Sequence, residues 1–192
     1  TSNRINTPEV AEDLISSGCA DMVSLARPFL ADPNFVAKAA AGKAAQIAPC
    51  IACNQACLDH TFSGKISSCL VNPRACFEKE LAIKPALQPK KLAIVGAGPA
   101  GLSCAMTAAQ CGHRVTVFDK SDRIGGQLNL AKQVPGKEEF WGLVDWFETM
   151  MTLLKVDMRL GYEAGAADFE GFDEVIIATG VSPRDPAIRG QT

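Results

Sequence analysis

Aromatic residues are scarce in this sequence, and its basic residues form no run. Phe, Trp and Tyr together make up 6% of the 192 residues, and the formal net charge is −2 at pH 7. Proteins that bind nucleic acids or anionic membranes electrostatically gather Lys and Arg into a patch, often with aromatic side chains between them. Composition therefore argues against a nucleic-acid partner, while a hydrophobic content of 47% is ordinary for a globular protein.

Long apolar segments are also lacking. A membrane-spanning helix needs roughly 18 to 20 consecutive apolar residues, and no segment of the sequence is that long. The beginning, TSNRINTPEVAEDL, has neither the basic stretch nor the apolar core of a signal peptide. We therefore expect no membrane partner and a cytoplasmic location. The sequence does not begin with Met, which hints at a piece of a longer protein.

Eight cysteines are present despite the lack of a secretion signal. In that setting, thiols that bind metal or carry out redox chemistry are expected in place of a disulfide framework. Four of them follow the spacing C-x2-C-x3-C-x11-C, namely Cys50, Cys53, Cys57 and Cys69. Zinc ribbons usually have two C-x2-C pairs, so the spacing favours an iron–sulfur cluster and leaves zinc as the alternative. Cys76 is a fifth candidate ligand, and the remaining three are expected to be small buried residues.

The first 48 residues alternate between helical and extended patterns. Thr7 followed by Pro8 is typical of a helix start. The patterns predict, in order, a helix over 8–18, a short buried strand over 21–26, a turn over 27–33 and a helix over 34–43. A single strand with its helices cannot bury its own apolar faces. We therefore expect an internal fragment whose first part belongs to a larger α/β unit.

The rest of the sequence divides into an irregular and a regular part. Residues 49–88 show no periodicity and are predicted to form a loop-built site followed by a linker. The regular part predicts a strand in KLAIVGAG, a helix in PAGLSCAMTAAQCG, a strand in HRVTVFDK, a helix over roughly 138–154, and strands in VDMRLG and DEVIIATG. Strands that alternate with helices in this way indicate a parallel α/β sheet.

A glycine motif lies between the first strand and the first helix of this regular part. Gly96, Gly98 and Gly101 form G-x-G-x-x-G, and Asp119 ends the next strand. In such a loop the glycines permit a tight turn, close approach to a pyrophosphate and packing of helix on strand, while the acid accepts hydrogen bonds from ribose. The acid would repel a 2′-phosphate, so the motif predicts a site for FAD or NAD; a purely structural glycine turn is the alternative.

Two further motifs bear on which dinucleotide is bound. GGQL at 125–128 follows the second strand, and IIATG at 176–180 closes the last one. Together with the glycine loop, this set resembles the FAD-binding half of the pyridine-nucleotide-disulfide reductase superfamily. The resemblance implies FAD, with the second glycine motif near the phosphate and ribitol of the flavin.

The order of motifs along the chain is more specific than any one of them. SLARPFLADP, CIACNQACLD, SCLVNPRAC, IVGAGPAGL and GGQLNLAKQVPGKEEF follow one another. This order resembles the trimethylamine dehydrogenase-like branch of the old yellow enzyme family, and CNQACLD and PGKEEF resemble its bacterial NADPH-dependent 2,4-dienoyl-CoA reductases. The resemblance implies the end of an FMN-binding (β/α)8 barrel at 1–48, a 4Fe–4S loop and linker at 49–88, and an incomplete Rossmann-like FAD-binding domain at 89–192.

The resemblance also implies roles for individual residues. It makes Cys50, Cys53, Cys57 and Cys69 the cluster ligands and Cys76 structural. The implied FMN-binding residues, at the phosphate, are Arg4, Ala26 and Arg27. The implied FAD-binding residues are Gly96, Gly98, Ala100, Gly101, Asp119, Gly126, Gln127, Lys137, Ala164 and Gly180. A surface arginine at position 27 and a solvated lysine at position 137 are the alternatives.

The implied activity is an electron path from NADPH through FAD, a 4Fe–4S cluster and FMN to a 2,4-dienoyl-CoA in fatty-acid metabolism. The partners would be an acyl-CoA and a pyridine nucleotide, and the NADPH domain and most of the FMN site would lie outside these residues. No residue here is assigned as the catalytic acid. Other enoates or amines as substrates, a non-catalytic electron-transfer module, and a zinc-stapled protein are the competing hypotheses.

Overall fold

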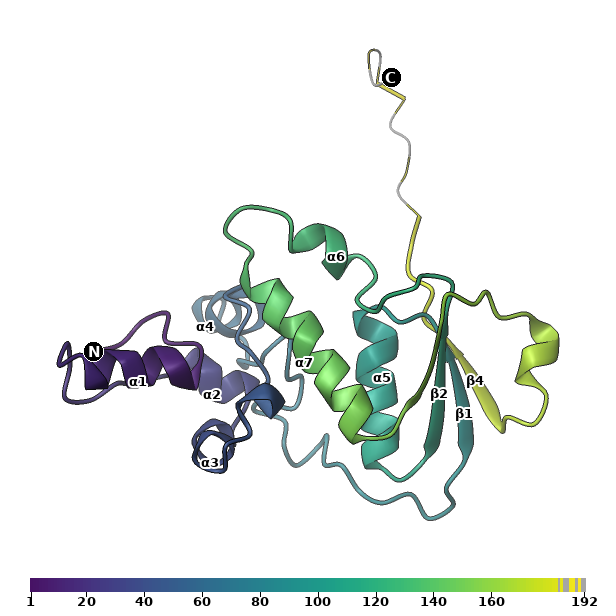
Figure 1. Cartoon of the computed structure of the whole chain (residues 1–192), viewed down its shortest axis with the longest axis horizontal. Helices are drawn as coiled ribbons and strands as arrows, with labels where there is room; N and C mark the ends of the chain where they lie inside the picture. The colour runs from purple at the N-terminus through teal and green to yellow at the C-terminus, as the bar shows by residue number, and fades with distance from the viewer. Residues whose placement is uncertain (183, 185–186, 189, 191–192) are drawn as a thin grey trace.

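A four-stranded parallel sheet forms the second half of the molecule in the computed structural model, which describes residues 1–182, 184, 187–188 and 190. The strands lie in the order β3-β2-β1-β4 (Figure 1). Their bounds are Lys91–Val95 for β1, Arg114–Asp119 for β2, Asp157–Leu160 for β3 and Glu174–Ile177 for β4. The predicted strands of this part of the chain are confirmed, and the parallel α/β sheet with them.

Two helices cover one face of the sheet (Figure 1). Helix α5 spans Pro99–Gln110, with Pro in its first turn, and α7 spans Glu139–Leu153, close to the predicted 138–154. Ile94 of β1, Leu102 of α5 and Phe147 of α7 belong to one buried core. The short helix α6, Leu128–Ala131, was not predicted, because GGQL was interpreted only as a glycine motif.

Aromatic side chains pack on Phe118, which is fully buried in β2. Its ring centroid lies 6.0 Å from that of Phe169 and 6.0 Å from that of Phe172. Phe169 ends a short 3-10 turn, η3, Ala166–Phe169. Beside this group Tyr162 donates a hydrogen bond of 2.6 Å from its hydroxyl to Asp168 Oδ1. This cluster fixes the connection between β3 and β4.

The first 48 residues form short helices outside the sheet (Figure 1). Helix α1 spans Pro8–Ser16, and the Thr7 hydroxyl accepts a hydrogen bond from Val10 N, as the Thr-Pro pair predicts. Helix α3 spans Phe35–Ala40, within the predicted range. The predicted turn at 27–33 is wrong, because its residues begin with a helix, α2, Arg27–Ala31. Pro28 lies in the first turn of α2, where proline is well tolerated.

The strand predicted over 21–26 is also wrong. Ser24 forms a single parallel bridge with Ser2, in which Ser24 N donates to Thr1 O at 2.8 Å. A strand requires a continuous row of backbone hydrogen bonds to a neighbour. Among the described residues, only Ser2 is bridged to this segment.

Residues 49–88 contain no strand, and every one of them is described. A 3-10 turn η1, Ala44–Gln46, precedes them, and they include the π-helical turn η2, Gln55–Asp59, followed by α4, His60–Phe62. Ala48 and Ile51 belong to the same buried core as β1 and α7. The irregular segment is therefore packed onto the α/β layer.

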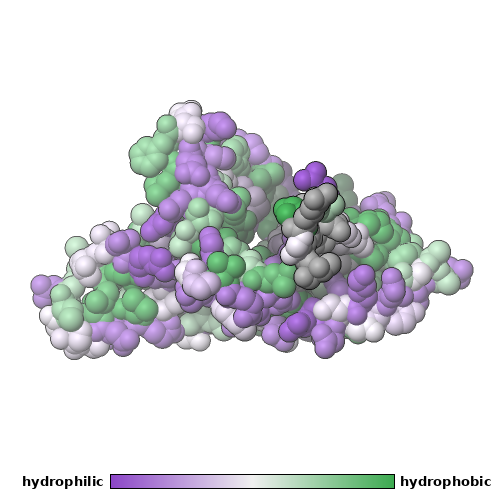
Figure 2. Space-filling view, turned by 90° about the horizontal axis from the view of Figure 1, so that it is seen from above, coloured by the Kyte–Doolittle hydropathy of each residue, from purple (hydrophilic) through white to green (hydrophobic). Residues whose placement is uncertain are grey.

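Apolar and polar residues are mixed over the face seen in Figure 2, with no broad surface of one kind. In the described part of the chain, none of the helices combines the length and the apolar character needed to cross a lipid bilayer.

Candidate cofactor site

Four cysteines line one small pocket, and they are the four picked out by their spacing. Cys50, Cys53, Cys57 and Cys69 share it with Arg27, Asn54 and the apolar side chains of Leu30, Ile51, Ala56 and Leu70. The backbone is left-handed at Ala52 (φ 52°) and Asn54 (φ 60°), which bends the chain on either side of Cys53. Turn η2 then carries Cys57. All eight cysteines of the chain are free thiols.

The cysteines surround the pocket without converging on a single point. Within the described residues, no three Cys, His, Asp or Glu side chains come close enough together to hold one metal ion. A tetrahedral zinc site needs each sulfur about 2.3 Å from the same ion. His60 does not line the pocket, and its Nδ1 lies 3.0 Å from Ile66 O. Four cysteine side chains around an apolar pocket are the donor set that an iron–sulfur cluster uses.

Burial affects the thiols of this pocket. It raises the pKa of Cys50 and of Cys69 above the ordinary value for cysteine. At Cys50, a backbone hydrogen bond from Ala52 and the charge of Arg27 act in the opposite direction. A metal site whose thiols are desolvated in this way must displace protons when the metal binds.

A buried carboxylate holds the segment that leads into the pocket. Asp32 is 3% exposed and accepts hydrogen bonds from Lys38 Nζ (2.5 Å) and from Ala48 N (2.9 Å), two residues before Cys50. Lys38 Nζ also donates to Gln46 O at 2.8 Å, and so does Trp146 Nε1 of α7 at 3.1 Å. This network was not predictable from the sequence, because the acceptor at Gln46 is a backbone carbonyl, which every residue type has.

The arginines assigned to an FMN phosphate have different neighbours. Arg27, half-buried at the start of α2, donates from Nη1 to Asn54 Oδ1 at 2.6 Å. Arg4 forms an ion pair with Glu139 in the first turn of α7. Ala26, at the N-terminal boundary of α2, is exposed. Asn54 and Glu139 were missed by the sequence analysis, since each is recognisable only through its partner.

The glycine loop connects β1 to α5, and its glycines have different surroundings. A Cβ built on Gly96 would lie 2.2 Å from Ala178 O, and one on Gly101 would lie 1.9 Å from Gly96 O. A Cβ on Gly98 would meet nothing within 4 Å. Gly96 and Gly101 are thus required by the protein's own backbone, whereas the space beside Gly98 is free for a ligand. Gly98 immediately precedes α5, whose N-terminus favours anions.

Asp119 closes the opposite side of this loop. Its Oδ2 accepts a hydrogen bond from Ala97 N at 2.6 Å, and its Oδ1 accepts one from Ser121 N at 2.8 Å. Gly125 N donates to Ala97 O at 2.8 Å, and a Cβ on Gly126 would lie 3.1 Å from Gly98 Cα. The GGQL motif therefore lies against the glycine loop, and Gly125 joins the residues identified from the sequence.

The other residues assigned to FAD are spread around this edge. Gln127 Nε2 donates to Val181 O at 3.3 Å, close to Gly180, which has a left-handed backbone (φ 77°). Ala100 is exposed in the first turn of α5, and Ala164 is half-buried between β3 and η3.

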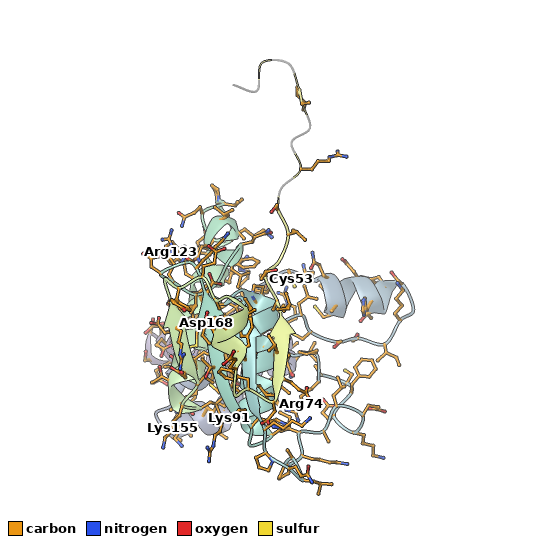
Figure 3. All side chains as sticks on the ribbon, turned by 90° about the vertical axis from the view of Figure 1, so that its right-hand side faces the viewer. Cys53, Arg74, Lys91, Arg123, Lys155 and Asp168 are labelled. Carbon is orange, nitrogen blue, oxygen red and sulfur yellow. The ribbon has the colours of Figure 1, made fainter. Side chains whose placement is uncertain are left out.

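A second pocket separates the cysteine loop from the start of α5. Cys53 and Gln55 line it on one side, Pro99 and Ser103 on another, and Lys137 contributes its side chain. Cys53 also lines the cysteine pocket, so one residue belongs to the walls of both. Figure 3 shows Cys53 at the same end of the sheet as Arg123, in the loop after β2, with Lys91 of β1 at the opposite end. Parallel α/β sheets bind their ligands at the carboxyl ends of the strands.

Comparison with known proteins gives matches over both halves of the chain. Residues 90–192 match the model of the pyridine nucleotide-disulphide oxidoreductase family, and residues 1–46 match that of the NADH:flavin oxidoreductase / NADH oxidase family. A metal reductase of Desulforamulus reducens is 44% identical over 192 residues, which are 97% of this chain and 29% of that protein.

Two solved structures have the same arrangement over nearly the whole chain. The structure of a 2-naphthoyl-CoA reductase with 2-naphthoyl-CoA has a TM-score of 0.94 and 38% identity, and the match covers 98% of this chain and 29% of that one. Histamine dehydrogenase from Rhizobium sp. 4-9 has a TM-score of 0.87 and 27% identity, with 100% of this chain and 29% of that one covered. The chain thus spans less than a third of each of these proteins.

Proposed function

Since the chain belongs to the pyridine nucleotide-disulphide oxidoreductase family, we propose that it is the electron-transferring part of an iron–sulfur flavoprotein reductase. FAD would bind along the glycine loop, and a 4Fe–4S cluster would be held by Cys50, Cys53, Cys57 and Cys69. The observation that carries this proposal is the position of Cys53 in the walls of both pockets. A cluster held there would have Cys53 in the wall between it and the pocket beside Pro99, in the first turn of α5.

The chain's own residues would bind and orient the flavin nucleotide. The space beside Gly98 admits the pyrophosphate, and the free N–H groups at the start of α5 donate to it. The Asp119 carboxylate already accepts hydrogen bonds from two backbone N–H groups. Its remaining lone pairs can accept hydrogen bonds from the ribose hydroxyls. Lys137 and Gln127 would contact the flavin from the segment between β2 and α7.

The proposed units are a barrel end at 1–48, a cluster loop and linker at 49–88, and a FAD-binding unit at 89–192. When bound, FAD, the cluster and FMN would supply the redox chemistry, namely the relay of electrons from a pyridine nucleotide to the substrate. Arg4, Ala26 and Arg27 would contribute to the FMN site. The protein keeps the cofactors in order and excludes water from the cysteine pocket.

A conjugated acyl-CoA, such as a 2,4-dienoyl-CoA, is the proposed final electron acceptor. Supporting this choice, a similar structure holds 2-naphthoyl-CoA, an acyl-CoA with a conjugated ring system. Reduction of the carbon–carbon double bond would take the hydride at one carbon and a proton at the other. Oxidation of an amine is the second candidate, because histamine dehydrogenase shares the same arrangement.

Metal and flavin analysis of anaerobically purified protein tests the proposal. We expect about four iron and four acid-labile sulfide per chain, with bound FAD. Cys53→Ser should lose iron and sulfide together, because a serine hydroxyl is a poor ligand for the cluster. Cys76→Ser is the matched control, since Cys76 is exposed in the same segment and should leave the iron content unchanged. One zinc per chain without sulfide would overturn the proposal.

A further inference from the structure

Arg27 is the only charged side chain among the described residues that line the cysteine pocket. Its neighbours there are the four thiols, one amide and apolar side chains. Arg27 is half-buried, Pro28 beside it is buried, and a hydrogen bond holds the guanidinium to Asn54. A fixed positive charge in an apolar pocket acts strongly on any charge placed close to it, because little solvent screens it.

Asn54 fixes the direction of this guanidinium. Its Oδ1 accepts the 2.6 Å hydrogen bond from Arg27 Nη1. Asn54 itself has a left-handed backbone (φ 60°), and its carbonyl accepts a hydrogen bond from Asp59 N at 3.0 Å. The arginine is thus anchored to the residue that turns the chain between Cys53 and Cys57. It contacts the loop of the proposed ligands directly.

We propose that Arg27, held by Asn54, is a positioning residue of the cysteine pocket that raises the reduction potential of the cluster. The inference rests on the proposed function, since it requires a cluster on the four cysteines. Each electron added to a cluster makes its charge more negative, so a fixed cation beside it favours the reduced state. A guanidinium has five N–H donors. The hydrogen bond to Asn54 uses one of these donors, so the remaining N–H groups of Arg27 can bind a phosphate at the proposed FMN site.

Two substitutions of Arg27 separate its charge from its shape. Arg27→Gln removes the charge, and Arg27→Lys keeps it. With iron and sulfide quantified in each protein, the cluster is reduced stepwise and followed by electron paramagnetic resonance. At a fixed potential we expect the reduced-to-oxidised ratio of Arg27→Gln to fall about tenfold, equivalent to about 59 mV for one electron. Arg27→Lys keeps the charge, so its ratio should stay within about 1.5-fold of that of the unmodified protein. An unchanged ratio in Arg27→Gln with a full cluster overturns the inference.

Asn54→Gly is the independent test, because glycine adopts a left-handed backbone without strain. It removes the anchor and leaves the charge of Arg27 in place. We expect a smaller fall in the same ratio, about threefold, with the iron content unchanged. If Arg27→Gln holds no iron, this variant decides, and an unchanged ratio overturns the inference. Absence of iron and sulfide from the unmodified protein would overturn the proposed function as well, whereas a full cluster with unchanged ratios overturns only the role of Arg27.

Discussion

The three glycines after β1 differ in the space around their Cα atoms, and this difference can be tested one residue at a time. A methyl group on Gly101 would lie 1.9 Å from Gly96 O, an atom of the backbone that cannot move aside. A methyl group on Gly98 would meet nothing within 4 Å. We expect Gly101→Ala to lower the free energy of unfolding by about 3 kcal/mol. Urea unfolding followed by circular dichroism measures this change.

Gly98→Ala should have the opposite pattern. The φ of Gly98 is −78°, which alanine adopts freely, so the free energy of unfolding should change by less than about 0.5 kcal/mol. The added methyl group would occupy the space proposed for the pyrophosphate. We expect the affinity for FAD to fall at least about tenfold, about 1.4 kcal/mol, in a fluorescence titration of the flavin-free protein. Unchanged flavin affinity in Gly98→Ala would contradict the assignment of the loop.

The pair Tyr162–Asp168 predicts a pH dependence. The hydrogen bond from the Tyr162 hydroxyl, with a second from Gly165 N, lowers the pKa of Asp168 below its usual value of about 3.9. The same bond raises the pKa of Tyr162 above its usual value of about 10. The stabilising contribution is therefore complete between these two values. It is lost as the pH falls through the lowered pKa of Asp168, and again as the pH rises through the raised pKa of Tyr162.

Tyr162→Phe isolates this effect. The pKa of Asp168 should rise toward its usual value, although the bond from Gly165 N remains. A carbon-detected NMR titration of the Asp168 carboxyl in both proteins measures the shift. Glu163→Gln, which changes the adjacent exposed residue, is the control and should leave the titration of Asp168 in place. The same midpoint in Tyr162→Phe and the unmodified protein would show that the hydroxyl does not act on Asp168.

At the scale of elements, local patterns predict those parts whose partners lie nearby in the sequence. The strand, glycine turn and helix over 91–110 each carry their own signal, because apolar runs, Gly and Pro fix them locally. Residues 21–26 have a strand's composition, but in the described part of the chain Ser24 has only Ser2 as a bridge partner. Composition alone does not make a strand, because the neighbouring hydrogen bonds come from elsewhere in the chain.

The cysteine site was likewise predictable from the sequence only in part. The spacing of the four cysteines was enough to predict that they lie together, since all four line one pocket. The residues that support the loop were not predictable, because Asp32 and Trp146 reach it across 16 and 100 residues of sequence. Their contacts are with backbone atoms, which leave no trace in the residue types of the loop.

Asp32 supports this loop, and its role can be tested by removing Lys38, the cation that pairs with it. Lys38→Met leaves a carboxylate that is 3% exposed, and the described residues then offer it only the backbone donors Asn34 N and Ala48 N. An uncompensated buried charge is costly, so we expect the free energy of unfolding to fall by about 3 kcal/mol. Urea unfolding measures it. Lys43→Met, at an exposed lysine just after α3, should change stability by less than about 0.5 kcal/mol.

Asp32→Asn combined with Lys38→Met completes the test. The neutral amide removes the buried charge, so the double variant should be more stable than Lys38→Met alone. If the double variant is less stable by the full sum of the two single changes, the two residues do not interact, and the ion pair does not hold the loop.

At the scale of the whole molecule, the cysteine loop and the nucleotide-binding layer share one buried core. Ala48 and Ile51 lie in the same cluster as Ile94 of β1 and Trp146 of α7, and Cys53 packs against it. Because a shared core unfolds as a unit, neither cofactor site should lose its structure while the other remains. The boundary predicted at residue 88 thus marks a change of sequence pattern, and the buried core contains residues from both sides of it.

Heating the protein with its cofactors bound tests this coupling. We expect the visible absorbance of the cluster, the fluorescence of released flavin and far-ultraviolet circular dichroism to change at one common midpoint. Ile51→Ala removes buried methyl groups between the loop and the layer, which should lower the free energy of unfolding by about 3 kcal/mol. It should lower all three midpoints together by about 6 to 12 °C. Ile66→Ala, at a 65% exposed position of the same segment, should lower none. Loss of the cluster signal well below the flavin and dichroism transitions would mean that the loop unfolds independently of the layer.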